Sequence, residues 1–298
     1  MSPAPGHFDD CIIVDWSAAA QPSSGTDSCW VAYGALHGAG RVTTSNYATR
    51  QETSQAIEAR LERSLAQGRR TLICVDVSFG FPAGAARILG LKGAPKWRAL
   101  WRGIEERSVD DEKNRNNRFE VANEFNRVSR TRVFWGRPIA KNFEKYDCLP
   151  IKNVSVDGLL DSPLPRLRAS EELAGPGVIS NWMLVGKGAV GGQVLTCLPY
   201  LERLRRTLDG QLSVWPFEGL GDVGTPAVLA ETWFGLFDWK GEKGSCRDEQ
   251  QVRGTLKAIK AGGREGILSF LEPASMTALS KKRQGEILAE EGWTFGVC

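Results

Sequence analysis

The hydrophobic positions of this chain gather first in short continuous runs. The run at residues 11–14 (CIIV) leads directly into Asp15, and the run at residues 72–75 (LICV) leads into Asp76. Runs of this length and composition are typical of buried strands. A carboxylate at the end of a buried strand is costly unless something compensates it. We therefore expect the two aspartates to meet at neighbouring strand positions, with a proton or a metal ion between them.

The intervening residues predict how these two strands are connected. Residues 28–36 and 41–47 have the composition of strands and are joined by a short turn, which favours an antiparallel meander. Residues 51–67 have apolar positions at helical spacing. A helical connection between strands of one sheet normally implies parallel pairing. The pattern predicts an α/β fold: a mixed sheet, with an antiparallel three-strand meander plus parallel strands, flanked by helices.

The rest of the chain continues the alternation of strands and helices. Residues 85–177 become rich in Pro and Gly and poorly periodic toward their end, so we interpret them as a helical and loop insertion in one domain spanning residues 1–298. The helices expected are residues 96–107, a segment ending at Val128, and residues 193–208, 248–262 and 280–291; the strands expected are residues 181–185, 212–217 and 227–233.

Composition narrows the chemistry. Hydrophobic residues make up 42% of the 298 residues and charged residues 24%, as in ordinary globular proteins. No apolar run reaches the ~18 residues of a membrane span, and the N-terminus lacks the features of a signal peptide, so we expect a cytoplasmic protein without membrane contact. Seven cysteines without a Cys-x-x-Cys pair, and only two histidines, argue against zinc. Any metal should be a hard cation held by carboxylates.

Acidic residues on strands and at a helix start supply such a site. Asp15, Asp76, Glu231 and Asp248 are the candidates, with Glu218 as a fifth. Such a set is suited to Mg²⁺ or Mn²⁺, and two such ions can activate water and stabilise the leaving oxygen of a phosphodiester. Structural alternatives remain: Asp248 as a helix N-cap, Glu231 as the partner of an arginine, and purely structural roles for the others.

Two further stretches are candidates for substrate binding. Gly186-x-Gly188-x-x-Gly191, with Lys187, is consistent with a phosphate loop before a helix, with a nicotinamide-binding fingerprint, or with a plain tight turn. Residues 92–145 carry 14 Lys and Arg against 8 Asp and Glu, and this excess favours a polyanionic partner. This segment contains a cluster of two arginines and two asparagines: Arg115, Asn116, Asn117 and Arg118. These side chains can contact phosphates and bases, or can cap a helix and line a domain contact.

Several motifs together resemble a known family. IIVDWS at residues 12–17, VDVSFGFP at 75–82, WPFE at 215–218 and AETW at 230–233 resemble the bacterial family of predicted ribonuclease-H-like nucleases designated domain of unknown function 429, in its alphaproteobacterial branch. The resemblance implies a ribonuclease-H-like fold and the same four acids, Asp15, Asp76, Glu231 and Asp248. The family's Glu-x-Tyr-Pro-Ser-like context is altered here to ETWFG at residues 231–235.

These observations lead to one main hypothesis and two alternatives. The main hypothesis is a metal-dependent phosphodiester hydrolase acting on nucleic acid, DNA or RNA, through the carboxylate cluster. The first alternative is phosphoryl transfer or another reaction on a nucleotide or small phosphate compound. The second is a module of the same fold that binds nucleic acid without catalysis.

Overall fold

The structure is a computed structural model that describes residues 5–154 and 158–298. Its centre is a sheet of seven strands, in the order β3-β2-β1-β4-β8-β7, with β9 (Thr294–Phe295) paired to β8. β1 (Asp10–Asp15), β2 (Cys29–Ala35) and β3 (Thr43–Tyr47) form the antiparallel meander. β4 (Thr71–Val75), β8 (Ala227–Thr232) and β7 (Leu212–Val214) continue in parallel. The α/β class and the mixed sheet expected from the sequence are therefore confirmed.

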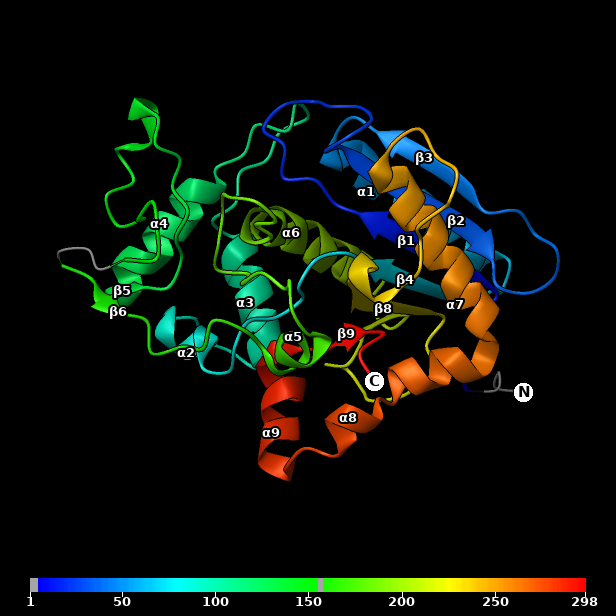
Figure 1. Ribbon diagram of the computed structural model, residues 1–298. Coiled ribbons are helices and arrows are strands. Elements are labelled where there is room, and N and C mark those ends of the chain that lie inside the picture. Colours follow the sequence, from blue (N-terminus) through cyan, green and yellow to red (C-terminus); the bar gives the residue numbers. More distant parts are fainter. Residues whose placement is uncertain (1–4, 155–157) are drawn as a thin grey trace.

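Helices cover both faces of the sheet (Figure 1). α1 (Arg50–Ala66), α3 (Lys96–Glu105) and α6 (Gly191–Thr207) pack with Val14, Val75 and Leu229 in one hydrophobic core. α7 (Arg247–Leu271) packs with Ile13 and Cys74 in a second core on the other face. Because side chains of a strand alternate between faces, the continuous apolar runs are explained by two buried faces.

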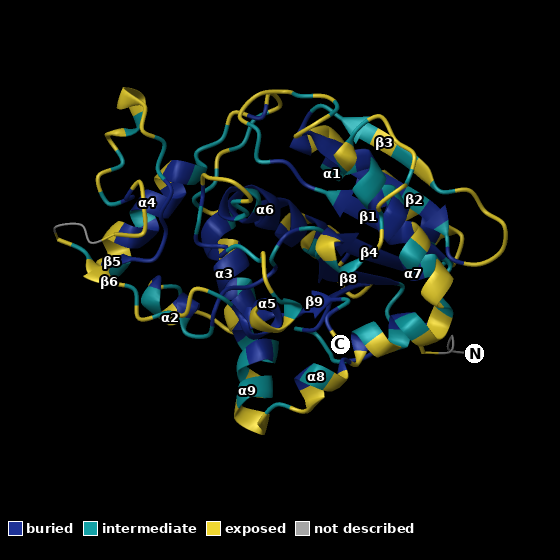
Figure 2. Ribbon diagram, viewed as in Figure 1, coloured by how far each residue is buried: buried dark blue, intermediate teal, exposed yellow. Residues whose placement is uncertain are grey.

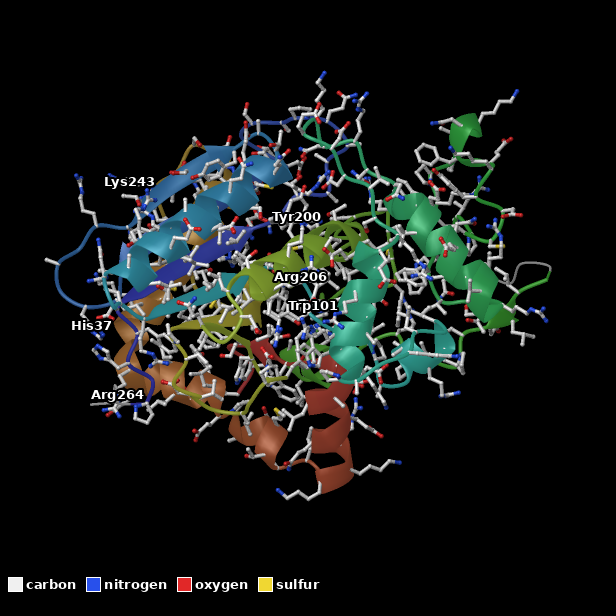
Figure 3. All side chains as sticks on the ribbon, turned by 180° about the vertical axis from the view of Figure 1, so that it is seen from behind. His37, Trp101, Tyr200, Arg206, Lys243 and Arg264 are labelled. Carbon is white, nitrogen blue, oxygen red and sulfur yellow. The ribbon has the colours of Figure 1, made fainter. Side chains whose placement is uncertain are left out.

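The segment at residues 85–177 contains helices, loops and a small separate sheet. It holds α2 (Ala85–Ile88), α3, α4 (Arg118–Ser129), the 3-10 helix η1 (Lys141–Phe143), α5 (Ala169–Ala174) and a small sheet of β5 (Thr131–Arg132) and β6 (Leu160–Asp161). Trp97 and Trp101 of α3 are fully buried, and the ribbons of α3 and α6 are largely dark blue, the colour of buried residues, in Figure 2. Trp101 and Tyr200 are labelled near the meeting of α3 and α6 in Figure 3. The segment thus supplies part of the central core.

The helices and strands differ from expectation in several places. Residues 181–185 form no strand, only an isolated bridge between Trp135 and Met183. α7 continues to Leu271 across a kink at Gly263, because glycine tolerates the left-handed φ there. The last predicted helix is divided into α9 (Lys281–Glu286) and one π turn, η3 (Ile287–Glu291), and two short segments, η2 (Phe234–Leu236) and α8 (Ala274–Thr277), were not expected. No helix in the described residues has the length and apolarity needed to cross a membrane.

Candidate functional site

Asp15 and Asp76 lie side by side at the ends of two neighbouring parallel strands. Val14 of β1 pairs with Val75 of β4, and the amide of Asp76 donates to the carbonyl of Val14 at 2.9 Å. The residue after each valine is the aspartate, so the register brings the two acids to the same level of the sheet. This is the juxtaposition expected from the two apolar runs.

Both carboxylates face a cavity of about 760 Å³ at the carboxyl ends of the parallel strands. Ligands of open α/β sheets commonly bind at this edge. The walls carry six carboxylates and three guanidinium groups, so they are formally acidic. The acids are Asp15, Asp27, Asp76, Glu171, Glu231 and Asp248, and the arginines are Arg118, Arg168 and Arg247.

The two central carboxylates have no hydrogen-bond donor from the described residues. Burial, followed by the charges of Asp76, Asp248 and Asp27, raises the pKa of Asp15 well above its usual value. Burial and the charge of Glu231 raise the pKa of Asp76 to about 8. Two adjacent carboxylates without donors are electrostatically unfavourable when both are ionised, and a bound cation or proton relieves the repulsion.

Asp248 approaches this pair from the first turn of α7. Its Oδ2 accepts the amide of Asp27 at 2.9 Å, which joins the start of α7 to the loop after β1. Burial raises the pKa of Asp248, and the Asp27 amide opposes that shift. Asp248 is therefore not the N-cap of α7, a position held by Cys246.

Glu231 lies in the cavity wall, and its negative charge is neutralised by Arg168. Its carboxylate accepts one hydrogen bond from the Nη1 of Arg168, at 2.7 Å, and another from the Nη2 of the same guanidinium. The amide of Phe79 at 2.7 Å and the hydroxyl of Thr294 at 2.8 Å complete four donors. A carboxylate has about four acceptor positions, so Glu231 is saturated by the protein. The arginine partnership that the sequence left open is what the structure contains.

Arg168 is fully buried, and all five of its N–H groups have partners. Besides Glu231 it donates to Glu171, to the Ser78 hydroxyl and to the carbonyl of Glu291. Sequence reasoning missed Arg168, Glu171, Asp27 and Arg247 as residues of this cavity. The only available signal was indirect: an acid in the middle of a buried strand needs a cation, but nothing local identifies which one.

Glu218 and Lys187 lie outside the cavity lining. Glu218 pairs with Arg205 and accepts the amide of Val214 at 2.9 Å, so it joins α6 to β7. Lys187 is exposed, although its neighbours Gly186 and Gly188 line the cavity. The glycine motif therefore borders the site, and its lysine side chain is not part of the wall.

Of the 14 basic residues in the 92–145 segment, only Arg118 lines the cavity. Arg115 is exposed and pairs with Asp111 at 2.6 Å. Asn117 holds the loop before α4 by accepting the amide of Val109 and donating to the carbonyl of Arg107. Seven of the 14 form ion pairs within the described residues: Lys96, Arg98, Arg102, Arg107, Arg115, Arg127 and Arg132.

The carboxylate oxygens of Asp15 and Asp76 are suitable ligands for a hard divalent cation. Within residues 5–154 and 158–298, no three His, Cys, Asp or Glu side chains are grouped so as to hold a metal by themselves. Mg²⁺ usually binds one or two carboxylates and completes its shell with waters and substrate phosphates. Two carboxylates without donors in a polar cavity meet that requirement.

The chain was compared with protein families, curated proteins and solved structures. A scan against models of protein families finds no match to this chain. Searches of curated proteins and of solved structures likewise find none.

Proposed function

We propose that this chain is a divalent-metal-dependent phosphodiester hydrolase acting on nucleic acid. The observation that carries the proposal is the pair Asp15 and Asp76, adjacent on parallel strands, without donors and facing one cavity. The arrangement of an antiparallel meander followed by parallel strands also supports assignment to the ribonuclease-H-like fold and to the family that the sequence resembles.

Asp15 and Asp76 would hold Mg²⁺ or Mn²⁺, with Asp248 and Asp27 at the edge of the same cavity. The ion would supply an activated water and charge stabilisation at the phosphate. In the reaction a water oxygen forms a bond to phosphorus, the bond to the leaving nucleoside oxygen breaks, and that oxygen ends protonated. Asp248, half-buried and with a raised pKa, is the nearby carboxylate we assign to accept the proton of water. Glu231 would orient Arg168 and the Phe79 amide.

A second candidate is phosphoryl chemistry on a nucleotide or a small phosphate compound. The volume of the cavity, about 760 Å³, and the single cation that the basic segment contributes favour it. A cavity of this volume lies in the range of small-ligand sites, roughly 300–1,000 Å³.

The test combines metal binding with hydrolysis. Thermal unfolding is measured with and without Mn²⁺ for the wild type, Asp15→Asn and Asp76→Asn, and cleavage of a fluorescent single-stranded oligonucleotide is followed in parallel. We expect Mn²⁺ to raise the melting temperature of the wild type only, and each substitution to lower cleavage by about a hundredfold or more. Equal Mn²⁺ stabilisation of all three proteins would contradict the metal site, and undiminished cleavage by Asp15→Asn would contradict the mechanism.

A further inference from the structure

Arg118 is a cavity-lining cation whose neighbouring carboxylates are already engaged. Its guanidinium donates to the Asn116 side chain at 2.7 Å, and its Nε is buried without a partner among the described residues. No carboxylate of the described residues lies within ion-pair distance of it. Burial, and then the charge of Arg50, lower the pKa of Arg118 to about 10.

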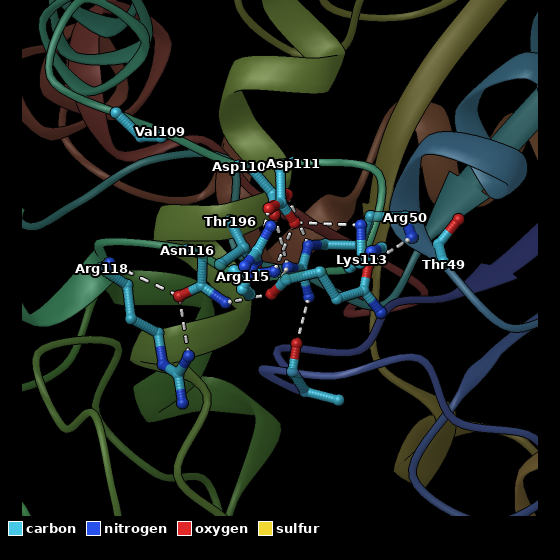
Figure 4. A network of polar contacts seen from close by, with 12 residues as sticks. Thr49, Arg50, Val109, Asp110, Asp111, Lys113, Arg115, Asn116, Arg118 and Thr196 are labelled. Carbon is cyan, nitrogen blue, oxygen red and sulfur yellow. Dashed lines mark hydrogen bonds and ion pairs between the residues drawn. The ribbon is translucent and has the colours of Figure 1, made fainter.

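The loop before α4 explains why Arg118 has no counterion in the part of the chain that the structure describes. Arg50 binds both oxygens of Asp110 at 2.6 Å each, and the Tyr200 hydroxyl donates to the same carboxylate at 3.1 Å. Arg115 forms an ion pair with Asp111. Figure 4 shows Arg118 apart from these pairs and joined only to Asn116. The guanidinium of Arg118 is held by packing beside a cavity, and the nearby carboxylates are bound by other arginines. Such a group is suited to bind an anionic ligand.

The surroundings fix Arg118 in this place. Its guanidinium stacks on the Phe119 ring, 4.5 Å from the centroid. A Cβ added to Gly192, in the first turn of α6, would come 3.3 Å from the Arg118 Nε. The side chain is therefore enclosed between α4 and the start of α6, which leaves it little freedom to seek a partner elsewhere.

The remaining walls indicate the size and kind of ligand. Trp233, Val178, Ile179 and Val190 are half-buried and line the same cavity. Aromatic and apolar walls can contact a nucleobase. A protein that tracks a long duplex uses about six to ten phosphate contacts, whereas the basic segment provides one cation here.

We infer that Arg118 binds the scissile phosphate of a dinucleotide-sized, single-stranded phosphodiester whose bases contact the apolar wall. The inference rests on the proposed function, because the acidic walls would repel this anion unless a divalent cation occupied Asp15 and Asp76. Binding of the dinucleotide should therefore require the metal, and the metal should bind without Arg118.

The experiment is calorimetric titration of the Mn²⁺-loaded protein with the dinucleotide thymidylyl-thymidine, compared with thymidine monophosphate and a 20-base-pair duplex. Every protein titrated, including the one that is wild type at Arg118, also carries Asp248→Asn, which removes the proposed proton acceptor and so slows hydrolysis during the titration. In a second series a methylphosphonate replaces the bridging phosphate and removes its charge. The variants are Arg118→Met, which keeps the stem on Phe119, and Arg118→Lys. Arg115→Met is the matched control, since Arg115 lies three residues earlier and outside the cavity.

We expect Arg118→Met to weaken dinucleotide binding by about tenfold to a hundredfold, with Mn²⁺ binding unchanged, Arg118→Lys intermediate and Arg115→Met unchanged. The methylphosphonate should bind weakly to every protein. Equal dinucleotide affinity in wild type and Arg118→Met would overturn the inference, as would a preference for the duplex or the mononucleotide. Absence of Mn²⁺ binding in the wild type would instead overturn the proposed function. If Arg118→Met does not fold, an unchanged affinity in Arg118→Lys together with tight methylphosphonate binding by the wild type would overturn the inference.

Discussion

Arg168 and Glu231 form a buried ion pair, joined by two hydrogen bonds, in the wall of the cavity that Asp15 and Asp76 also line. The arginine precedes α5 and the glutamate lies in β8, so the pair joins the segment at residues 85–177 to the central sheet. Because Glu231 is saturated by donors and Glu171 is bound by Arg168, the cavity acids left for a ligand are Asp15, Asp76, Asp27 and Asp248.

Arg168→Met should destabilise the protein strongly. Removing one partner of a buried pair leaves an uncompensated charge, which typically costs about 3–5 kcal/mol. Urea unfolding should show this loss as a lower midpoint, and the double variant with Glu231→Gln should recover part of it because the orphaned charge is gone. Arg115→Met, at an exposed ion pair, serves as the control with little change. A loss no larger than that of the control would show that Arg168 does not stabilise the sheet.

Metal-free protein should lose stability as the pH rises from about 4 to about 8. The pKa of Asp76 in the folded state is about 8, above the value of about 3.9 in an unfolded chain. Between these values Asp76 binds more protons in the folded state than in the unfolded state, so its contribution to the free energy of unfolding falls with pH and levels off above 8. The raised pKa of Asp15 acts in the same direction. Asp76→Asn should flatten the profile measured by urea unfolding with a chelator present. A wild-type profile that rises over this window would contradict the shift.

Glu218→Gln should leave metal binding unchanged while lowering stability modestly. Glu218 pairs with Arg205, away from the cavity, so its neutralisation weakens a hydrogen-bonded pair worth about 1 kcal/mol. Thermal unfolding should show the same Mn²⁺-induced rise as in the wild type, in contrast to Asp76→Asn. Loss of the Mn²⁺ response in Glu218→Gln would place this glutamate in the metal site after all.

Gly191→Ala should disturb the start of α6. An added Cβ would stand 2.5 Å from the carbonyl oxygen of Asn181 and 2.7 Å from that of Met183, and neither backbone atom can move without shifting the loop. We expect lower stability by about 1–3 kcal/mol and weaker dinucleotide binding. The control is Gly266→Ala in α7, where an added Cβ meets nothing within 4 Å and helix propensity should raise stability by about 0.5–1 kcal/mol. Equal effects of the two changes in urea unfolding would contradict the steric argument.

The sequence by itself determined the elements and the central pair. Hydrophobic periodicity is a local property, so the runs ending in Asp15 and Asp76 and the helical spacing at residues 51–67 could be interpreted without the fold. Parallel pairing then follows from the helical crossover, and the register seen in the structure places the two aspartates level with each other. The π turn at the C-terminus and the irregular residues 181–185 were not predictable, because tertiary contacts overrode local pattern there.

The tertiary structure alone decided which charges are neutralised. Arg168 lies 63 residues before Glu231, Asp27 meets Asp248 across 221 residues, and Arg205 reaches Glu218. Ion pairing depends on distance and burial in space, and neither is encoded in the spacing of residues along the chain. Among the described residues, the same pairing leaves Asp15 and Asp76 without donors and Arg118 without a carboxylate. By satisfying the other charges, the fold determines which groups remain available to a ligand.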